Sequence, residues 1–90
     1  MIVTAIRHPV QDYATWKAAY DTMPPTSRGA KFARVNRAVD DPNMVTVVSG
    51  FDTLDEARAF LGSGELKAKM AEAGVVGEPR IEIYQEVEVI

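Results

Sequence analysis

Residues 80–90 read RIEIYQEVEVI, and this stretch decides the fold of the chain. Its side chains alternate along the backbone, which is typical of a half-buried β-strand. We therefore predict a strand over residues 80–90, with a mainly apolar face and a mainly acidic face. The apolar face would carry Ile81, Ile83, Val87 and Val89, and the other face would carry Glu82, Tyr84, Glu86, Glu88 and Ile90.

Three further stretches predict strands. Residues 2–8 (IVTAIRH) form the first, which Pro9 ends because proline has no amide hydrogen to donate to a sheet. Residues 31–40 and 44–51 form the second and third. Asp41-Pro42-Asn43 lies between them and predicts a tight turn, because Asp, Pro and Asn are the residues that favour its corners.

Two helices separate these strands. Asp12 can accept hydrogen bonds from the free amides of a first helix, which would run to about residue 21 or 23. Thr53 and Glu56 have the spacing of a capping box and open the second helix. Gly62-Ser63-Gly64 interrupts that helix, and Ser63 can cap the segment after it. The order β-α-β-β-α-β predicts an α+β, ferredoxin-like sandwich, in which one antiparallel four-stranded sheet keeps one uncovered face.

Length and composition favour a single domain, residues 1–90, that associates with itself. A chain this short buries only about 60% of its unfolded surface, so its core is small. We therefore expect a homodimer that covers the open sheet face. The chain has no cysteine, which excludes disulfides and thiolate metal sites.

Charge and hydropathy narrow the range of partners and locations. The net charge of −3 argues against nucleic acid, since phosphate binding needs a basic surface. No apolar stretch approaches the roughly 20 residues of a membrane span. Because a strand is predicted from residue 2 onward, we also expect no signal peptide. We expect a cytoplasmic protein that contacts neither membrane nor nucleic acid.

Three local strings carry a resemblance to a known superfamily. They are HPVQDYATW at residues 8–16, RAVDDPN at 37–43 and GSGELKAKMAEAG at 62–74. Together with the order of elements, they resemble the dimeric α/β-barrel superfamily, which includes antibiotic-biosynthesis-monooxygenase-type and small cyclase-like proteins. The resemblance implies two sheets packed face to face across a dimer axis, and a pocket between sheet and helices in each protomer. Its members range from cofactor-independent oxygenases and haem-degrading enzymes to proteins without known activity.

The first predicted helix carries an aromatic stripe. Tyr13, Trp16 and Tyr20 are spaced i, i+3 and i+7 and therefore lie on one helical face. One interpretation is that they pack on the sheet as core. The other is that Trp16 and Tyr20 wall a pocket for a flat substrate, with Tyr20 near a proline-rich loop that acts as a gate. The loop is residues 22–31, which is long for so small a domain.

His8 is the only histidine, and it is the natural proton carrier near neutral pH. A structural hydrogen bond at the end of its strand is the alternative role. Because no second histidine and no cysteine accompany it, we expect no metal site, and we expect no bound cofactor.

Two polar residues fall in the middle of the second strand. Arg34 and Asn36 share a face with Phe32, and Arg37 lies on the opposite face. Arg34 and Asn36 could form the polar wall of a pocket and bind a substrate oxygen or enolate. Alternatively, Arg34 pairs with glutamates of the last strand across a dimer interface. A shift of the register by one residue would exchange the two faces.

These residues lead to two functional hypotheses. The first is a cofactor-independent monooxygenase- or cyclase-like enzyme for a small flat molecule, with His8 and Asn36 catalytic and with Trp16, Tyr20 and Arg34 binding substrate. The second is a non-catalytic homodimer that binds a ligand or serves as a structural module. A cavity below about 300 Å³, or one with purely aliphatic walls, would favour the second. RNA binding through the sheet is a third reading. It predicts exposed aromatic residues on the central strands, whereas these strands offer mainly Val, Ala and Thr, and the chain is net acidic.

Overall fold

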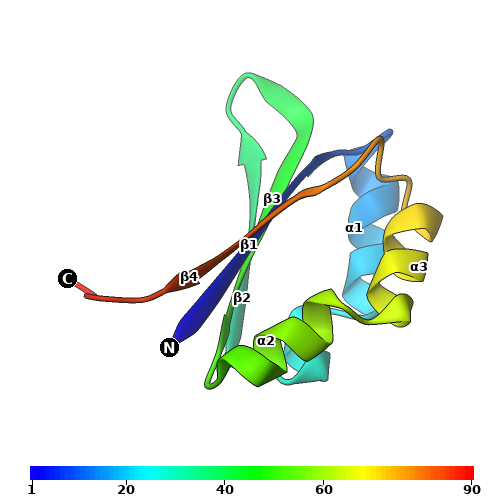
Figure 1. Ribbon diagram of the computed structural model, residues 1–90. Coiled ribbons are helices and arrows are strands. Elements are labelled where there is room, and N and C mark those ends of the chain that lie inside the picture. Colours follow the sequence, from blue (N-terminus) through cyan, green and yellow to red (C-terminus); the bar gives the residue numbers. More distant parts are fainter.

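A computed structural model describes residues 1–90. It has two layers, a four-stranded antiparallel sheet and a layer of helices on one of its faces (Figure 1). The sheet order is β2-β3-β1-β4, which confirms the predicted ferredoxin-like arrangement. The elements are β1 (Ile2–Pro9), α1 (Tyr13–Thr22), the short 3₁₀ helix η1 (Pro25–Arg28), β2 (Phe32–Ala38), β3 (Asp41–Phe51), α2 (Leu54–Leu61), α3 (Gly64–Glu72) and β4 (Arg80–Gln85).

The helix starts follow local side-chain chemistry. Asp12 caps α1 by accepting a hydrogen bond from the Thr15 amide at 2.9 Å. Thr53 caps α2, because its hydroxyl accepts a hydrogen bond from the Glu56 amide at 3.1 Å. The Glu56 carboxylate reaches back to the Thr53 hydroxyl at 3.0 Å, whereas the predicted capping box would have it accept from the Thr53 amide. Ser63 accepts from the Leu66 amide at 3.0 Å and so begins α3 as a separate helix. The three predicted caps are confirmed.

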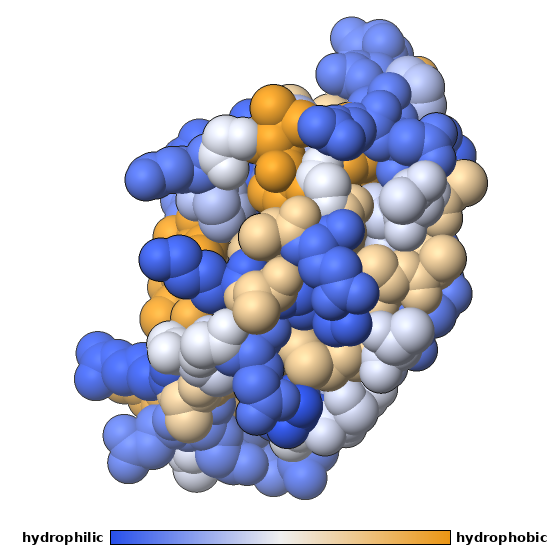
Figure 2. All heavy atoms as spheres, turned by 90° about the vertical axis from the view of Figure 1, so that its right-hand side faces the viewer, coloured by the Kyte–Doolittle hydropathy of each residue, from blue (hydrophilic) through white to orange (hydrophobic).

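The covered face of the sheet holds the core. Thr4, Ile6 and His8 of β1 point toward the helices and are buried. Ile6 pairs with Val47 and His8 with Val45, so alternate residues of β3 lie on the same face. Helix α1 covers the half of this face around Trp16, where Ala73 at the end of α3 joins it. Helix α2 covers the half around Phe51, together with Leu66 and Met70 of α3. Figure 2 shows the helical side, where hydrophilic residues are interspersed with small apolar areas.

The turn between β2 and β3 differs from the prediction. The structure places it at Val39-Asp40, and Asp41, Pro42 and Asn43 are the first residues of β3. The register shifts after Arg37, which brings Ala38 opposite Asp41. Proline is tolerated in such a position because it lies at a strand start beside an irregularity. The predicted turn chemistry is nevertheless there, since the Asp41 carboxylate accepts from the Asn43 amide at 3.0 Å.

The last strand is shorter than predicted and ends at Gln85. Gln85 pairs with Ile2, and the Glu86 amide makes one more hydrogen bond, to the Met1 carbonyl at 2.9 Å. Beyond that point β1 offers no further backbone partner. Residues 86–90 therefore leave the sheet, and Val87 and Ile90 are fully exposed.

The other face of the sheet has no helix over it (Figure 1). Phe32 of β2 pairs with Gly50 of β3, and its ring lies over that glycine. The Arg34 guanidinium lies 4.2 Å from the centre of the Phe32 ring. Tyr84 of β4 is half exposed on the same face. None of the helices is both long and apolar enough to cross a membrane.

Candidate functional site

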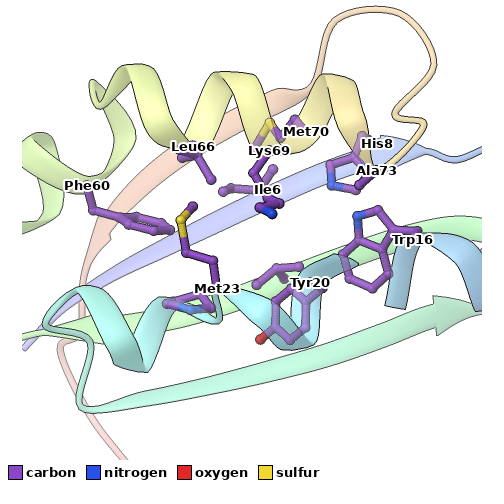
Figure 3. Close-up of a pocket in the computed structure, with 12 residues that line it drawn as sticks. Ile6, His8, Trp16, Tyr20, Met23, Phe60, Leu66, Lys69, Met70 and Ala73 are labelled. Atoms are coloured by element: carbon purple, nitrogen blue, oxygen red, sulfur yellow. The ribbon is translucent and has the colours of Figure 1, made fainter. Parts of the chain in front are cut away.

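A cavity lies between the covered face of the sheet and helices α1 and α3. Its volume is about 40 Å³, and its walls are mostly apolar. Figure 3 shows side chains of β1, α1 and α3 converging on this space. His8 and Lys69 are the two basic side chains in the wall, and no carboxylate lines it. The structure holds no cluster of three or more potential metal ligands.

His8 enters the cavity from the sheet. Its side chain is 2% exposed, and its Nδ1 atom has no hydrogen-bond partner. Burial lowers the pKa of the imidazole, because a charged ring is poorly solvated there. An unpaired buried polar atom costs about 1–3 kcal/mol of stability. His8 is thus held in its neutral form, and its ring contributes to the cavity wall.

Trp16 forms the wall beside His8. The two rings meet edge to face, with 5.7 Å between their centres. On its other side Trp16 stacks on Tyr20, with ring centres 5.0 Å apart and planes inclined by 27°. Trp16 is 3% exposed and belongs to the core cluster, so it serves as core and as cavity wall at once.

Tyr20 and Tyr13 extend this aromatic wall along α1. Burial raises the pKa of the Tyr20 phenol, because the phenolate would lose solvation. Tyr13 lies 5.9 Å from Trp16, and the Arg37 guanidinium covers its outer face at 3.9 Å from the ring centre. The predicted aromatic stripe therefore exists, and a cation closes its outer end.

Lys69 of α3 is a site residue that the sequence analysis missed. Its side chain is 25% exposed and pairs with the carboxylate of Glu72 at 3.3 Å. Leu66 and Ala73 mark the inner face of α3, and Lys69 stands three residues after the first and four before the second. That helical spacing places it on the same face, and it is the signal that could have identified Lys69.

Arg34 and Asn36 are not brought into this cavity. They pair with Val48 and Thr46, whose side chains lie on the uncovered face. Val35 between them pairs with Val47, which is buried under the helices. Both predicted site residues are exposed. Within one chain, the sheet separates them from His8, Trp16 and Tyr20.

The chain between α1 and β2 closes one end of the cavity. Met23 and Pro25 contribute to the wall, and Arg28 follows at the end of η1. The Arg28 guanidinium forms an ion pair with Glu65 in the first turn of α3, and it also contacts the Met23 sulfur at 3.4 Å. This ion pair, which we call the latch, joins the two walls on either side of the cavity.

The overall arrangement matches solved structures over nearly the whole chain. SnoaB, a cofactor-independent oxygenase from Streptomyces nogalater, aligns over 99% of this chain and 95% of its own, with a TM-score of 0.80 and 12% identity. An antibiotic biosynthesis monooxygenase aligns over 98% and 100%, with a TM-score of 0.75 and 8% identity. A conserved protein from Methanosarcina mazei Go1 aligns over 96% and 92%, with a TM-score of 0.78 and 13% identity.

This chain has the antibiotic-biosynthesis-monooxygenase-like fold. In sequence, no protein-family model and no curated protein matches it. The likeness to the monooxygenase-like structures is thus one of architecture, and it agrees with the resemblance seen in the sequence. The reaction has to be argued from the cavity itself, because one fold supports many reactions.

Proposed function

We propose that this chain is a cofactor-independent monooxygenase- or cyclase-like enzyme that acts on a small, flat, aromatic or polyketide-like molecule. One observation carries the proposal: a buried histidine, with its pKa lowered by burial, lines a cavity that is also walled by aromatic rings. The fold shared with SnoaB, a cofactor-independent oxygenase, supports the same class.

Both reaction types begin with the same chemical step. A proton leaves a carbon or a hydroxyl that is conjugated with a carbonyl, and an enolate or phenolate results. The enolate can then react with dioxygen or attack a second carbonyl of the same molecule. His8 would accept the proton, since an imidazole near its neutral form is an effective general base. Trp16 and Tyr20 would hold the flat ring by stacking.

The size of the cavity requires a wall to move. About 40 Å³ accommodates only a few water molecules, whereas small-molecule sites have roughly 300–1,000 Å³. Met23 and Met70 are unbranched and adaptable side chains in the wall. Displacement of Met23 with its loop would lengthen the cavity beside Tyr20. Tyr20 would then stand next to the gate, as the sequence analysis expected.

A hydroxylated anthrone is a suitable test substrate, because it is flat and has a C–H bond acidified by a ketone. Conversion to the quinone consumes one dioxygen and releases one water per molecule. We expect turnover by the wild-type protein and its loss in His8→Gln, measured by an oxygen electrode and quinone absorbance. Asn36→Ala is the matched variant on the opposite face. Loss of turnover in Asn36→Ala but not in His8→Gln would place the chemistry elsewhere.

The alternative function is a non-catalytic ligand-binding or structural module. The small cavity volume favours it by the criterion set from the sequence, while the aromatic and basic walls do not. A protein that binds flat ligands but converts none of them, in wild type and in His8→Gln alike, would support this alternative.

We also propose that the protein forms a homodimer through its uncovered sheet face, closing a dimeric α/β barrel. The exposed Tyr84, the exposed apolar side chains of Val87, Val89 and Ile90, and the stacked Phe32–Arg34 pair support this surface as an interface. Arg34 on the β2 edge and Glu82 on the β4 edge have opposite charges, and both lie on this face. A cytoplasmic location stays a prediction.

Native mass spectrometry at neutral pH tests the homodimer. We expect twice the chain mass for the wild type and a weakened dimer for Arg34→Glu. The exposed Arg58 of α2 provides the control, Arg58→Glu, which should leave the dimer intact. A wild-type monomer would contradict the proposal.

A further inference from the structure

The cavity wall has an electrostatic feature that the reaction class does not require. Lys69 is the only charged side chain that lines it, because His8 is held neutral and no carboxylate is present. The chain as a whole has a net charge of −3, whereas the cavity wall carries one positive charge, so the sign of the charge at the cavity is opposite to that of the whole chain. A site of this kind attracts an anion.

We infer that Lys69 selects a flat ligand that carries one anionic oxygen, such as an aromatic carboxylate or a phenolate, and orients it with that oxygen on α3 and its ring against Trp16 and Tyr20. This inference rests on the proposed ligand cavity, but it does not depend on turnover. It names the charge class of the ligand and the residue that determines it.

The bonding of Lys69 leaves its ammonium group available. Its partner in the protein is Glu72, three residues later on the same helix, at 3.3 Å. The Glu72 side chain is 69% exposed, and pairs of this kind contribute little to stability. A buried anionic ligand would make a stronger, charge-assisted hydrogen bond to the ammonium than the solvated carboxylate does.

The positions of the other groups determine how such a ligand lies. Lys69 comes from α3, whereas the stacked rings of Trp16 and Tyr20 come from α1 (Figure 3). A ring against the aromatic wall can therefore direct a substituent toward α3. His8 rises from the sheet floor, and its imidazole is a second polar group in the cavity wall. The remaining wall is apolar and excludes a second charge, because burying an unpaired charge is costly.

The experiment compares two ligands of nearly equal shape that differ in charge, para-nitrobenzoate and para-nitrobenzyl alcohol. Nitroaromatic rings quench tryptophan fluorescence, and Trp16 is the only tryptophan and lies in the cavity wall. At neutral pH we expect the carboxylate to bind about 10- to 100-fold more tightly than the alcohol, as expected for one charge-assisted hydrogen bond. The cation para-nitrobenzylamine should bind more weakly than the alcohol.

Lys69→Met should remove the preference for the carboxylate while keeping the affinity for the alcohol. Lys67→Met is the matched control, because Lys67 is exposed on the same helix and does not line the cavity. It changes the net charge equally and should keep the preference. If Lys69→Met fails to fold, the ordering of the three ligands on the wild type decides the question.

Three results would overturn the inference: equal affinity of the wild type for carboxylate and alcohol, equal loss of the preference in Lys67→Met, or no binding of either ligand. The first two leave the proposed reaction standing, since anthrone turnover depends on His8. Conversely, a carboxylate preference without any turnover would sustain Lys69 selectivity and reject only the proposed enzyme.

Discussion

Successive side chains of β1 point to opposite faces of the sheet, and the two faces have different environments. Thr4, Ile6 and His8 point under the helices and are at least 97% buried, whereas Arg7 on the other face is exposed. Polar atoms on the covered face lack partners: the Thr4 hydroxyl, His8 Nδ1 and the hydroxyl of Ser49 opposite Thr4. Polar groups on the uncovered face are solvated or stacked. The buried polar atoms without a hydrogen-bond partner therefore lie on the covered face, and a catalytic role is one explanation for such atoms.

The largest expected effect concerns stability on the two faces. Phe51 is fully buried on the covered face, and Tyr84 is half exposed on the other. Phe51→Ala should lower the free energy of unfolding by about 3–5 kcal/mol, because it leaves a cavity in the core. Tyr84→Ala should cost less than about 1 kcal/mol at low protein concentration. Urea denaturation measures the free energy of unfolding of both variants. An equal decrease in the two variants would contradict the view that the covered face holds the core and the other face does not.

A Tyr84→Ala effect that grows with protein concentration would sharpen the comparison. The stability of a self-associating protein depends on its concentration, whereas that of an isolated core does not. Concentration-independent denaturation of both variants would weaken the case for the uncovered face as an interface.

The second prediction concerns pH and His8. The pKa of His8 is lowered in the folded protein by burial, so the unfolded chain takes up this proton first as the pH falls. Stability should therefore decrease below an unfolded pKa of about 6.5, by at most about 1.4 kcal/mol per pH unit. The decrease should continue until the pH reaches the lower folded pKa.

His8→Gln should remove this part of the pH dependence, and urea denaturation between neutral pH and the onset of carboxylate titration measures it. Because the carboxylates are common to both proteins, the difference between wild type and variant isolates His8. Parallel stability curves for the two proteins would mean that His8 is not held neutral by burial.

The smallest effect is expected at the latch. Arg28 and Glu65 are 44% and 63% exposed, so Arg28→Ala should change stability by less than about 1 kcal/mol. The Arg28–Glu65 ion pair connects α3 with the loop that contains Met23. Loss of this ion pair should therefore let para-nitrobenzoate enter the cavity several-fold faster. Stopped-flow quenching of Trp16 measures the rate. Lys31→Ala breaks a similar exposed ion pair, with Asp52 at 3.3 Å, away from the cavity and should leave the rate unchanged.

Features decided by neighbouring residues were predictable from the sequence. The caps at Asp12, Thr53 and Ser63 depend on side chains within three positions of the amides they bind. The alternation of side chains along residues 2–8 correctly predicted that His8 and Ile6 lie on the same face of the sheet. Lys69 could also have been found, since helical spacing alone places it beside Leu66.

Features decided by pairing between distant segments were not predictable. The turn moved to Val39-Asp40 because the register of β2 on β3 shifts after Arg37. β4 ends at Gln85 because β1 begins opposite it. Likewise, the pairing of Val35 with Val47 determines which face of β2 meets the helices. That single pairing removes Arg34 and Asn36 from the cavity, although their spacing along the strand was read correctly.

The close approach of Phe32 and Gly50 has a consequence for how this sequence can diverge. A Cβ atom at position 50 would overlap the Phe32 ring and would lie 2.7 Å from the Met1 sulfur. Any side chain there must displace the ring and, with it, the guanidinium of Arg34 stacked upon it. A side chain at position 50 is therefore compatible with this packing only if the Phe32 ring moves away or residue 32 becomes smaller, so the two positions are expected to change together.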